Sequence, residues 1–178
     1  MEPSDDARLV ESAREGDRAA FGALYTRYSR MVHGILLARV PWAEVEDLVQ
    51  DVFLQAMRRV HTLRDTAAFG GWLAMITRNR ANDYHRRAPE NIELSEDLQG
   101  QSAEHVPARA EALRALEMIR RLPEAYRETL VLRLVEGLTG PEIAERTGLT
   151  AASVRINLHR GMKQLREKLD PAGERRDS

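Results

Sequence analysis

TGPEIAERTGLTAASVRINLHRGMK, which occupies residues 139–163, has the spacing of two short helices joined at a glycine. Thr139 can cap the first helix, and Glu142, three residues later, completes the pattern of a capping box. Gly148 can adopt the left-handed backbone conformation that a tight turn between helices requires. Thr150 predicts the start of the second helix, because threonine is a favoured N-cap residue. The stretch therefore predicts a helix-turn-helix.

The second helix of this motif is strongly basic. Between residues 150 and 168 there are five basic residues and one acidic residue, a net charge of +4. Basic side chains bind phosphates, and a short helix fits the major groove of DNA. A plain helical hairpin with a solvated basic face is the alternative, but Ala144 and Val154, placed where the helices would cross, favour DNA binding. The candidate DNA-contacting residues are Ser153, Arg155, Asn157, His159, Arg160 and Lys163.

Residues 44–60 carry the most regular amphipathic pattern in the chain, with apolar residues at steps of three and four. Acidic residues gather in the first turns and arginines in the last, an arrangement that the helix dipole alone explains. However, Asp47, Gln50 and Asp51 share one outward side of the predicted helix. Such a polar face is suited to an arginine-bearing helix of a partner protein.

The stretch FGGWLAMITRNRANDYHRR, residues 69–87, contains four arginines and one aspartate, a net charge of +3. Phe69, Leu73 and Ile76 have the spacing of core residues on an amphipathic helix. The later, polar part of the stretch combines cations with nearby aromatic rings, as surfaces that hold single-stranded nucleic acid do. The candidate residues are Arg78, Asn79, Arg80, Asp83, Arg86 and Arg87.

The distribution of charge indicates how the chain is divided, although the net charge is only −1. Residues 1–17 hold six acids and two bases, and residues 88–108 hold five acids and no Lys or Arg. No stretch alternates with period two for long enough to predict a strand. We therefore predict an all-α fold with two small helical domains joined by a flexible acidic linker. The predicted divisions are an acidic segment at 1–17, a domain at 18–88, a linker at 89–108, a domain at 109–170 and a tail at 171–178.

Composition excludes several classes of protein. Of the 178 residues, 43% are hydrophobic and 31% are charged, enough apolar material for a core. Cysteine is absent, which excludes disulfides, thiolate zinc sites, iron–sulfur clusters and cysteine nucleophiles. No run of apolar residues is long enough to span a membrane, and the acidic N-terminus does not resemble a signal peptide. We expect a cytoplasmic protein with no membrane insertion.

Sequence motifs for catalysis are missing as well. The five histidines are scattered, and the chain has no HExxH, P-loop, dinucleotide-binding glycine pattern or GxSxG. Asp47 and Asp51 are spaced to share a cation, but one outward pair on a helix is usually solvated. We expect no enzymatic activity, no metal site and no cofactor.

Taken together, these motifs resemble those of the extracytoplasmic-function (ECF, group 4) sigma factors of the sigma-70 family, from about Asp17 to Leu169. The stretch DLVQDVFLQAMRRV at 47–60 resembles the polymerase-binding helix of sigma region 2. Residues 69–87 resemble the part of region 2 that recognises the −10 promoter element. The sequence from Leu122 to Leu169 resembles region 4, which recognises the −35 element.

The resemblance implies a role for each candidate surface. Asp47, Gln50, Asp51 and Phe53 would contact the β′ coiled coil of core RNA polymerase, and region 4 would lie near the β flap. The arginine-rich set at 78–87 would contact the −10 element, partly as unpaired strand, and the basic set at 153–163 would contact the −35 element in promoter DNA. The family is usually held inactive by an anti-sigma factor.

Two other interpretations remain open from the residues alone. A dimeric helix-turn-helix regulator would bind a palindromic site without polymerase, and an interaction module would use its basic helix without touching DNA. Transcription in vitro, with core polymerase and with or without the protein, distinguishes the three.

Overall fold

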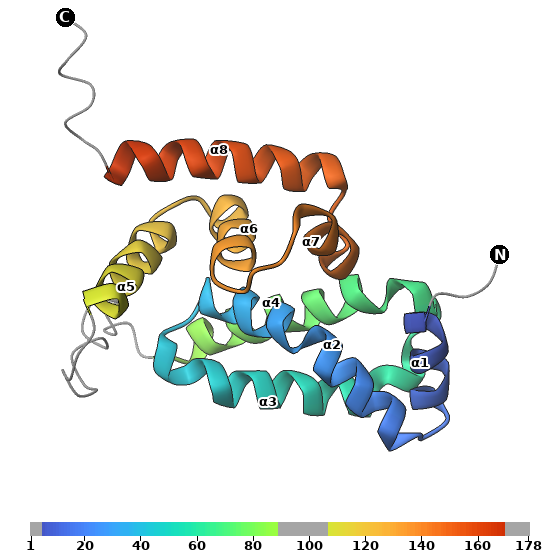
Figure 1. Ribbon diagram of the computed structural model, residues 1–178. Coiled ribbons are helices and arrows are strands. Elements are labelled where there is room, and N and C mark those ends of the chain that lie inside the picture. Colours follow the sequence, from blue (N-terminus) through green and yellow to red (C-terminus); the bar gives the residue numbers. More distant parts are fainter. Residues whose placement is uncertain (1–4, 89–106, 170–178) are drawn as a thin grey trace, which may run out of the picture.

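The computed structural model describes residues 5–88 and 107–169, and in this part of the chain every regular element is a helix (Figure 1). The N-terminal unit consists of α1 (Asp5–Arg14), α2 (Arg18–Leu37), α3 (Trp42–Arg59), two short 3-10 turns at Val60–Thr62 and Thr66–Ala68, and α4 (Phe69–Arg87). The C-terminal unit consists of α5 (Pro107–Arg120), α6 (Glu124–Leu134), α7 (Gly140–Thr147) and α8 (Ala151–Leu169). The predicted all-α fold is confirmed. The predicted linker lies outside the described residues except for its last two positions, which begin α5.

The local signals in the helix-turn-helix are confirmed. The Thr139 hydroxyl accepts from the backbone N–H of Glu142, whose carboxylate accepts from the backbone N–H of Thr139 at 2.8 Å. Gly148 has a φ of 73°, in the left-handed region, and separates α7 from α8. The Thr150 hydroxyl accepts from the backbone N–H of Ser153 at 3.1 Å, which caps α8.

Helix α1 was not predicted, because residues 1–17 were interpreted only as an acidic segment. Ala7, Val10 and Ala13 are buried on one face of α1, and Val10 is fully inaccessible. The Tyr28 hydroxyl of α2 donates to the Asp6 carboxylate at 2.6 Å. The N-terminal unit therefore includes α1, which packs against α2.

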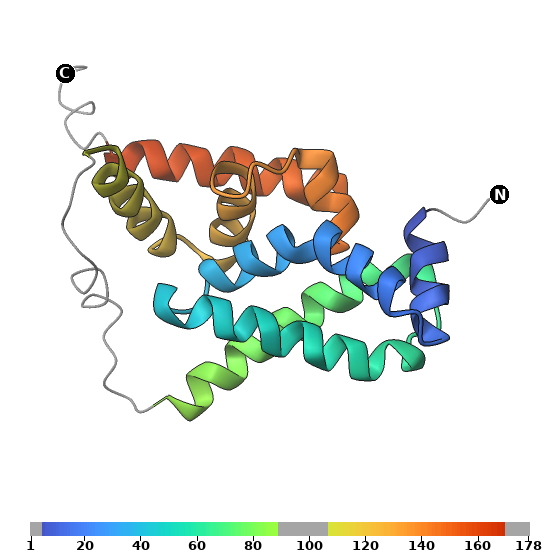
Figure 2. The same cartoon turned by 60° about the horizontal axis from the view of Figure 1, so that its bottom comes forward.

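The two units pack directly against each other (Figures 1 and 2). Both views place α6 and α7 between α8 and the N-terminal unit, where α2 meets α6 and α4 meets α7. At one end of this contact the Arg120 guanidinium donates to the backbone carbonyls of Leu37 and Val40, both at 2.9 Å. One hydrophobic core continues through both units.

Candidate DNA- and polymerase-binding surfaces

The basic side of α8 is positioned by the packing of the helix-turn-helix. Ile143 and Val154 are almost completely buried where α7 and α8 meet. Gly161 lets α8 approach α6, because a Cβ there would lie 3.0 Å from the Leu130 Cδ1 atom. With these apolar residues turned inward, the opposite side of α8 faces solvent. The predicted residues Arg155, His159, Arg160 and Lys163 are exposed on it.

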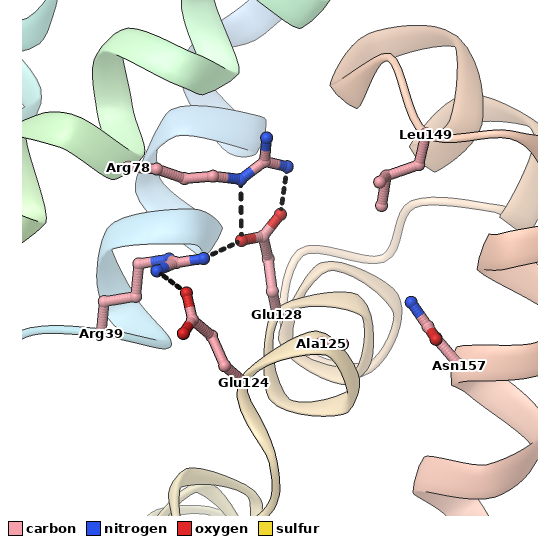
Figure 3. A pocket seen from close by; sticks show the side chains of 7 residues that line it. All are labelled: Arg39, Arg78, Glu124, Ala125, Glu128, Leu149 and Asn157. Atoms are coloured by element: carbon pink, nitrogen blue, oxygen red, sulfur yellow. Dashed lines mark hydrogen bonds and ion pairs between the residues drawn. The ribbon is translucent and has the colours of Figure 1, made fainter.

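The other two predicted residues of α8 are partly buried. The Ser153 hydroxyl lies 2.8 Å from that of Thr150 and so belongs to the helix cap. Asn157 lines a pocket between the two units (Figure 3). In this arrangement, Asn157 is therefore less accessible to DNA than its neighbours on the helix.

The polar face of α3 is exposed as expected, with Asp47, Gln50 and Asp51 all at the surface. Asp51 accepts a hydrogen bond from Arg80 at 2.5 Å. Leu54, one turn beyond Gln50, is 47% exposed and adds an apolar side chain to this face that sequence analysis missed. We call Asp47, Gln50, Asp51 and Leu54 the α3 face.

Phe53 does not belong to that surface. Its side chain is only 5% exposed, and its ring centroid lies 4.5 Å from that of Tyr25 in α2. The spacing that brings Leu48, Val49 and Val52 into the core also turns Phe53 inward. Phe53 therefore supports the α3 face from beneath, and we withdraw it from the set of partner-contacting residues.

The six predicted residues of α4 do not form one continuous surface. Asn79, Arg86 and Arg87 are exposed, and Arg86 forms an ion pair with Asp83. Arg80 turns toward α3, whereas Arg78 turns toward the C-terminal unit.

Arg78 ends in a cluster of charges between the units, in which Glu128 is buried (Figure 3). The Glu128 carboxylate, on α6, accepts from the Arg78 Nη2 atom at 2.6 Å and from the Arg39 Nη2 atom at 2.8 Å. Arg39 also forms an ion pair with Glu124. Burial raises the pKa of Glu128, but the hydrogen bonds and charges of Arg78 and Arg39 outweigh it and hold the pKa below its ordinary value. Glu128 is therefore a buried carboxylate whose charge is balanced by the other unit.

This charge cluster borders an open pocket of about 340 Å³. Its walls come from the α2–α3 turn, α4, α6, the α7–α8 turn and α8, so both units contribute to it (Figure 3). The lining residues are Arg39, Arg78, Glu124, Ala125, Glu128, Leu149 and Asn157.

A second charged contact joins the units through His33 of α2. Its Nδ1 atom lies 2.5 Å from the carboxylate of Glu136, which follows α6, and its Nε2 atom lies 3.7 Å from Glu46 of α3. The Trp42 ring packs edge-on against the imidazole. The hydrogen bond to Glu136 raises the pKa of His33, an effect that burial opposes and that the charges of Glu136 and Glu46 reinforce.

The raised pKa of His33 predicts a pH-dependent stability. A group with a higher pKa in the folded state stabilises it fully below the unfolded value of about 6.5, and this contribution is lost as the pH rises through the folded value. Urea unfolding from about pH 6 to about pH 8.5 should therefore show a larger loss of stability in the wild type than in His33→Gln. Parallel pH profiles would rule out a contribution from this pair.

The C-terminal unit is a helix-turn-helix with a basic helix, and it docks on a helical bundle with an acidic face. This combination is typical of a DNA-binding protein built from two units. Two family models match the chain, sigma-70 region 2 over residues 24–89 and sigma-70 region 4 over residues 112–165. The ECF RNA polymerase sigma-E factor of Haemophilus influenzae is 31% identical, and the match covers 93% of this chain and 96% of that protein. The corresponding Escherichia coli protein is 32% identical, with 93% and 95% covered.

The chain belongs to the sigma-70 family and to its ECF group. Among solved structures, that of CnrH in complex with the cytosolic domain of CnrY is similar, with a TM-score of 0.66 and 26% identity over 94% of this chain and 99% of CnrH. The protein is an alternative sigma factor that directs transcription initiation. None of the described helices is both long and apolar enough to cross a membrane.

Proposed function

We propose that the α3 face binds the β′ coiled coil of core RNA polymerase. Two exposed carboxylates and an amide give this face a polar rim, and Leu54 adds an exposed apolar side chain that a partner helix can cover. The buried side of α3, including Phe53, fixes the helix rigidly on the N-terminal unit. This exposed, rigid and acidic surface is the observation that best supports the proposal.

DNA recognition is divided between the units in this proposal. The exposed basic side of α8 contacts the −35 element, and the exposed residues Asn79, Arg86 and Arg87 of α4 contact the −10 strand. In the sigma-70 family, nearly two turns of duplex separate these elements. Because α6 packs against α2 and α7 against α4, we propose that the units part when they bind both elements. The 18 residues at 89–106, between the two units, can span about 60 Å when fully extended.

We further propose a regulatory protein partner of the anti-sigma type. The similar structure of CnrH contains the cytosolic domain of CnrY, so a related arrangement of helices accommodates a protein partner. On this chain, the α3 face is the surface where such a partner would compete directly with polymerase.

Transcription in vitro tests the proposed function as a whole. Core polymerase, genomic DNA templates and the purified protein should give start sites that are absent when the protein is omitted. A dimer that protects a palindromic site without polymerase would instead support the dimeric regulator, and a complete lack of new start sites would overturn the proposal.

The role of α8 can be tested by removing two exposed cations. Arg155→Ala combined with Arg160→Ala should weaken binding to −35 DNA about tenfold or more and lower the salt-dependence slope by about two, because two phosphate contacts are lost. Arg166→Ala is the matched control on the same helix. Equal losses in the double variant and the control would contradict a specific role for Arg155 and Arg160.

A further inference from the structure

We propose that Ile156 of α8 recognises a thymine in the −35 element, by packing its side chain against the 5-methyl group of that base. The proposal rests on the proposed function, because it specifies one contact that α8 makes in the major groove. Ile156 is not among the six candidate residues of α8, all of which are polar or charged.

Ile156 lies on the side of α8 that faces away from the rest of the protein. Successive residues of an α-helix are turned by about 100°, so Ile156 is directly opposite Leu165, which is buried. Figure 1 shows α6 on one side of α8 and no described helix on the opposite side. The Ile156 side chain is 45% exposed. It is therefore available to a ligand that approaches this side of α8.

The residue one turn before Ile156 leaves its side chain uncovered. A side chain in an α-helix leans toward the helix N-terminus, so that of Ile156 extends over the turn that contains Ala152. Ala152 is exposed and too small to cover it. In a helix-turn-helix, the N-terminal residues of the second helix contact the base edges. On the outermost side of α8, Ile156 is the first residue whose side chain is longer than a methyl group.

The charges beside Ile156 indicate that the ligand of this surface is nucleic acid. Arg155 and Arg160 lie on either side of Ile156 around the helix, and both are exposed. Residues 150–166 contain no acidic side chain. A surface of this charge binds phosphates. A single exposed aliphatic side chain is common on proteins, but this one lies between two cations that would hold it against a duplex.

The chemistry of isoleucine limits what Ile156 can recognise, because its side chain neither donates nor accepts a hydrogen bond. In the major groove, the base edges present hydrogen-bonding groups and, at thymine, an apolar 5-methyl group. Burying one methyl group against Ile156 strengthens binding about fourfold. Contact with a polar edge would instead remove water from that edge without replacing its hydrogen bonds. Ile156 therefore favours thymine at the position that it contacts.

The test uses the holoenzyme formed by core polymerase and the full chain. The start sites that this holoenzyme selects on genomic DNA define the promoters, and the strongest promoter supplies the duplex. Each thymine of its −35 element, on either strand, is replaced in turn by deoxyuridine, which pairs with adenine in the same way and lacks only the 5-methyl group. At one thymine, the replacement should weaken binding of the wild-type holoenzyme about fourfold. Ile156→Ala should bind the thymine and deoxyuridine duplexes equally.

Two further variants separate this contact from a general effect on α8. Leu169→Ala is the matched control, because Leu169 is also an exposed aliphatic residue of α8 but lies about three and a half turns beyond Ile156. It should keep the fourfold preference for thymine. Arg155→Ala with Arg160→Ala should bind both duplexes more weakly and keep the same ratio, because phosphate contacts do not depend on the methyl group. Circular dichroism should show the same helix content in all variants.

Three results would overturn the recognition of thymine by Ile156. They are a −35 element without thymine on either strand, equal binding of every thymine and deoxyuridine pair by the wild type, and a preference for thymine that persists in Ile156→Ala. A holoenzyme that gives no start sites would overturn the proposed function, and this proposal with it.

Discussion

Reversing the charge of Asp47 and Asp51 together, as Asp47→Arg with Asp51→Arg, should weaken binding to core polymerase at least about a hundredfold and abolish promoter-specific transcription. Both side chains are exposed on the α3 face, where two arginines would meet the basic side chains expected on the partner helix. Juxtaposed like charges at an interface cost several kcal/mol. Fluorescence anisotropy with labelled protein and core polymerase gives the affinity directly.

The matched control reverses the same number of acidic side chains at other places on the surface. Glu15→Arg with Glu167→Arg reverses two exposed acids outside the α3 face and should leave core binding within about twofold of the wild type. Asp47→Arg alone is also informative, because Asp51 additionally holds Arg80. If core affinity survives the double reversal on α3, the polymerase-binding surface lies elsewhere on the molecule.

Val10→Asp should lower the free energy of unfolding by about 3 kcal/mol or more, because it places a carboxylate at a fully buried position. Val10 lies with Ala7 and Ala13 on the buried face through which α1 packs against α2. Urea unfolding monitored by circular dichroism measures the loss.

Ala23→Asp provides the comparison, since Ala23 is exposed on α2 and the same acid there costs only helix propensity, about 0.7 kcal/mol or less. Equal losses in the two variants would mean that α1 contributes nothing to the stability of the N-terminal unit and behaves as the acidic segment that the sequence predicted.

Features that depend on neighbouring residues were predictable from the sequence. The capping box at Thr139, the turn at Gly148 and the outward position of Asp47 each follow from spacing within one or two helical turns. The same periodicity predicts a core position for Met57, which is 47% exposed, because it does not show how far around a helix the core extends. In α1, three small apolar residues among acids gave too weak a signal.

Contacts between the units could not be predicted. Arg78 and Glu128 are 50 positions apart, and each looks like an ordinary surface charge in its own helix. The interpretation of Arg78 as a DNA-contacting residue was based only on its neighbours in α4. Its actual partner depends on how the two units dock. The sequence around Arg78 does not indicate that arrangement.

The contacts of Arg120 imply that the two units share their stability. This side chain supplies hydrogen bonds to the carbonyls of Leu37 and Val40, which lie just where α2 gives way to the turn before α3. Its guanidinium has a lowered pKa because burial disfavours the charge. A substitution that loosens α5 therefore also removes support from the end of α2. Substitutions in one unit of this sigma factor are therefore constrained by the other unit, even though each unit has its own recognition surface.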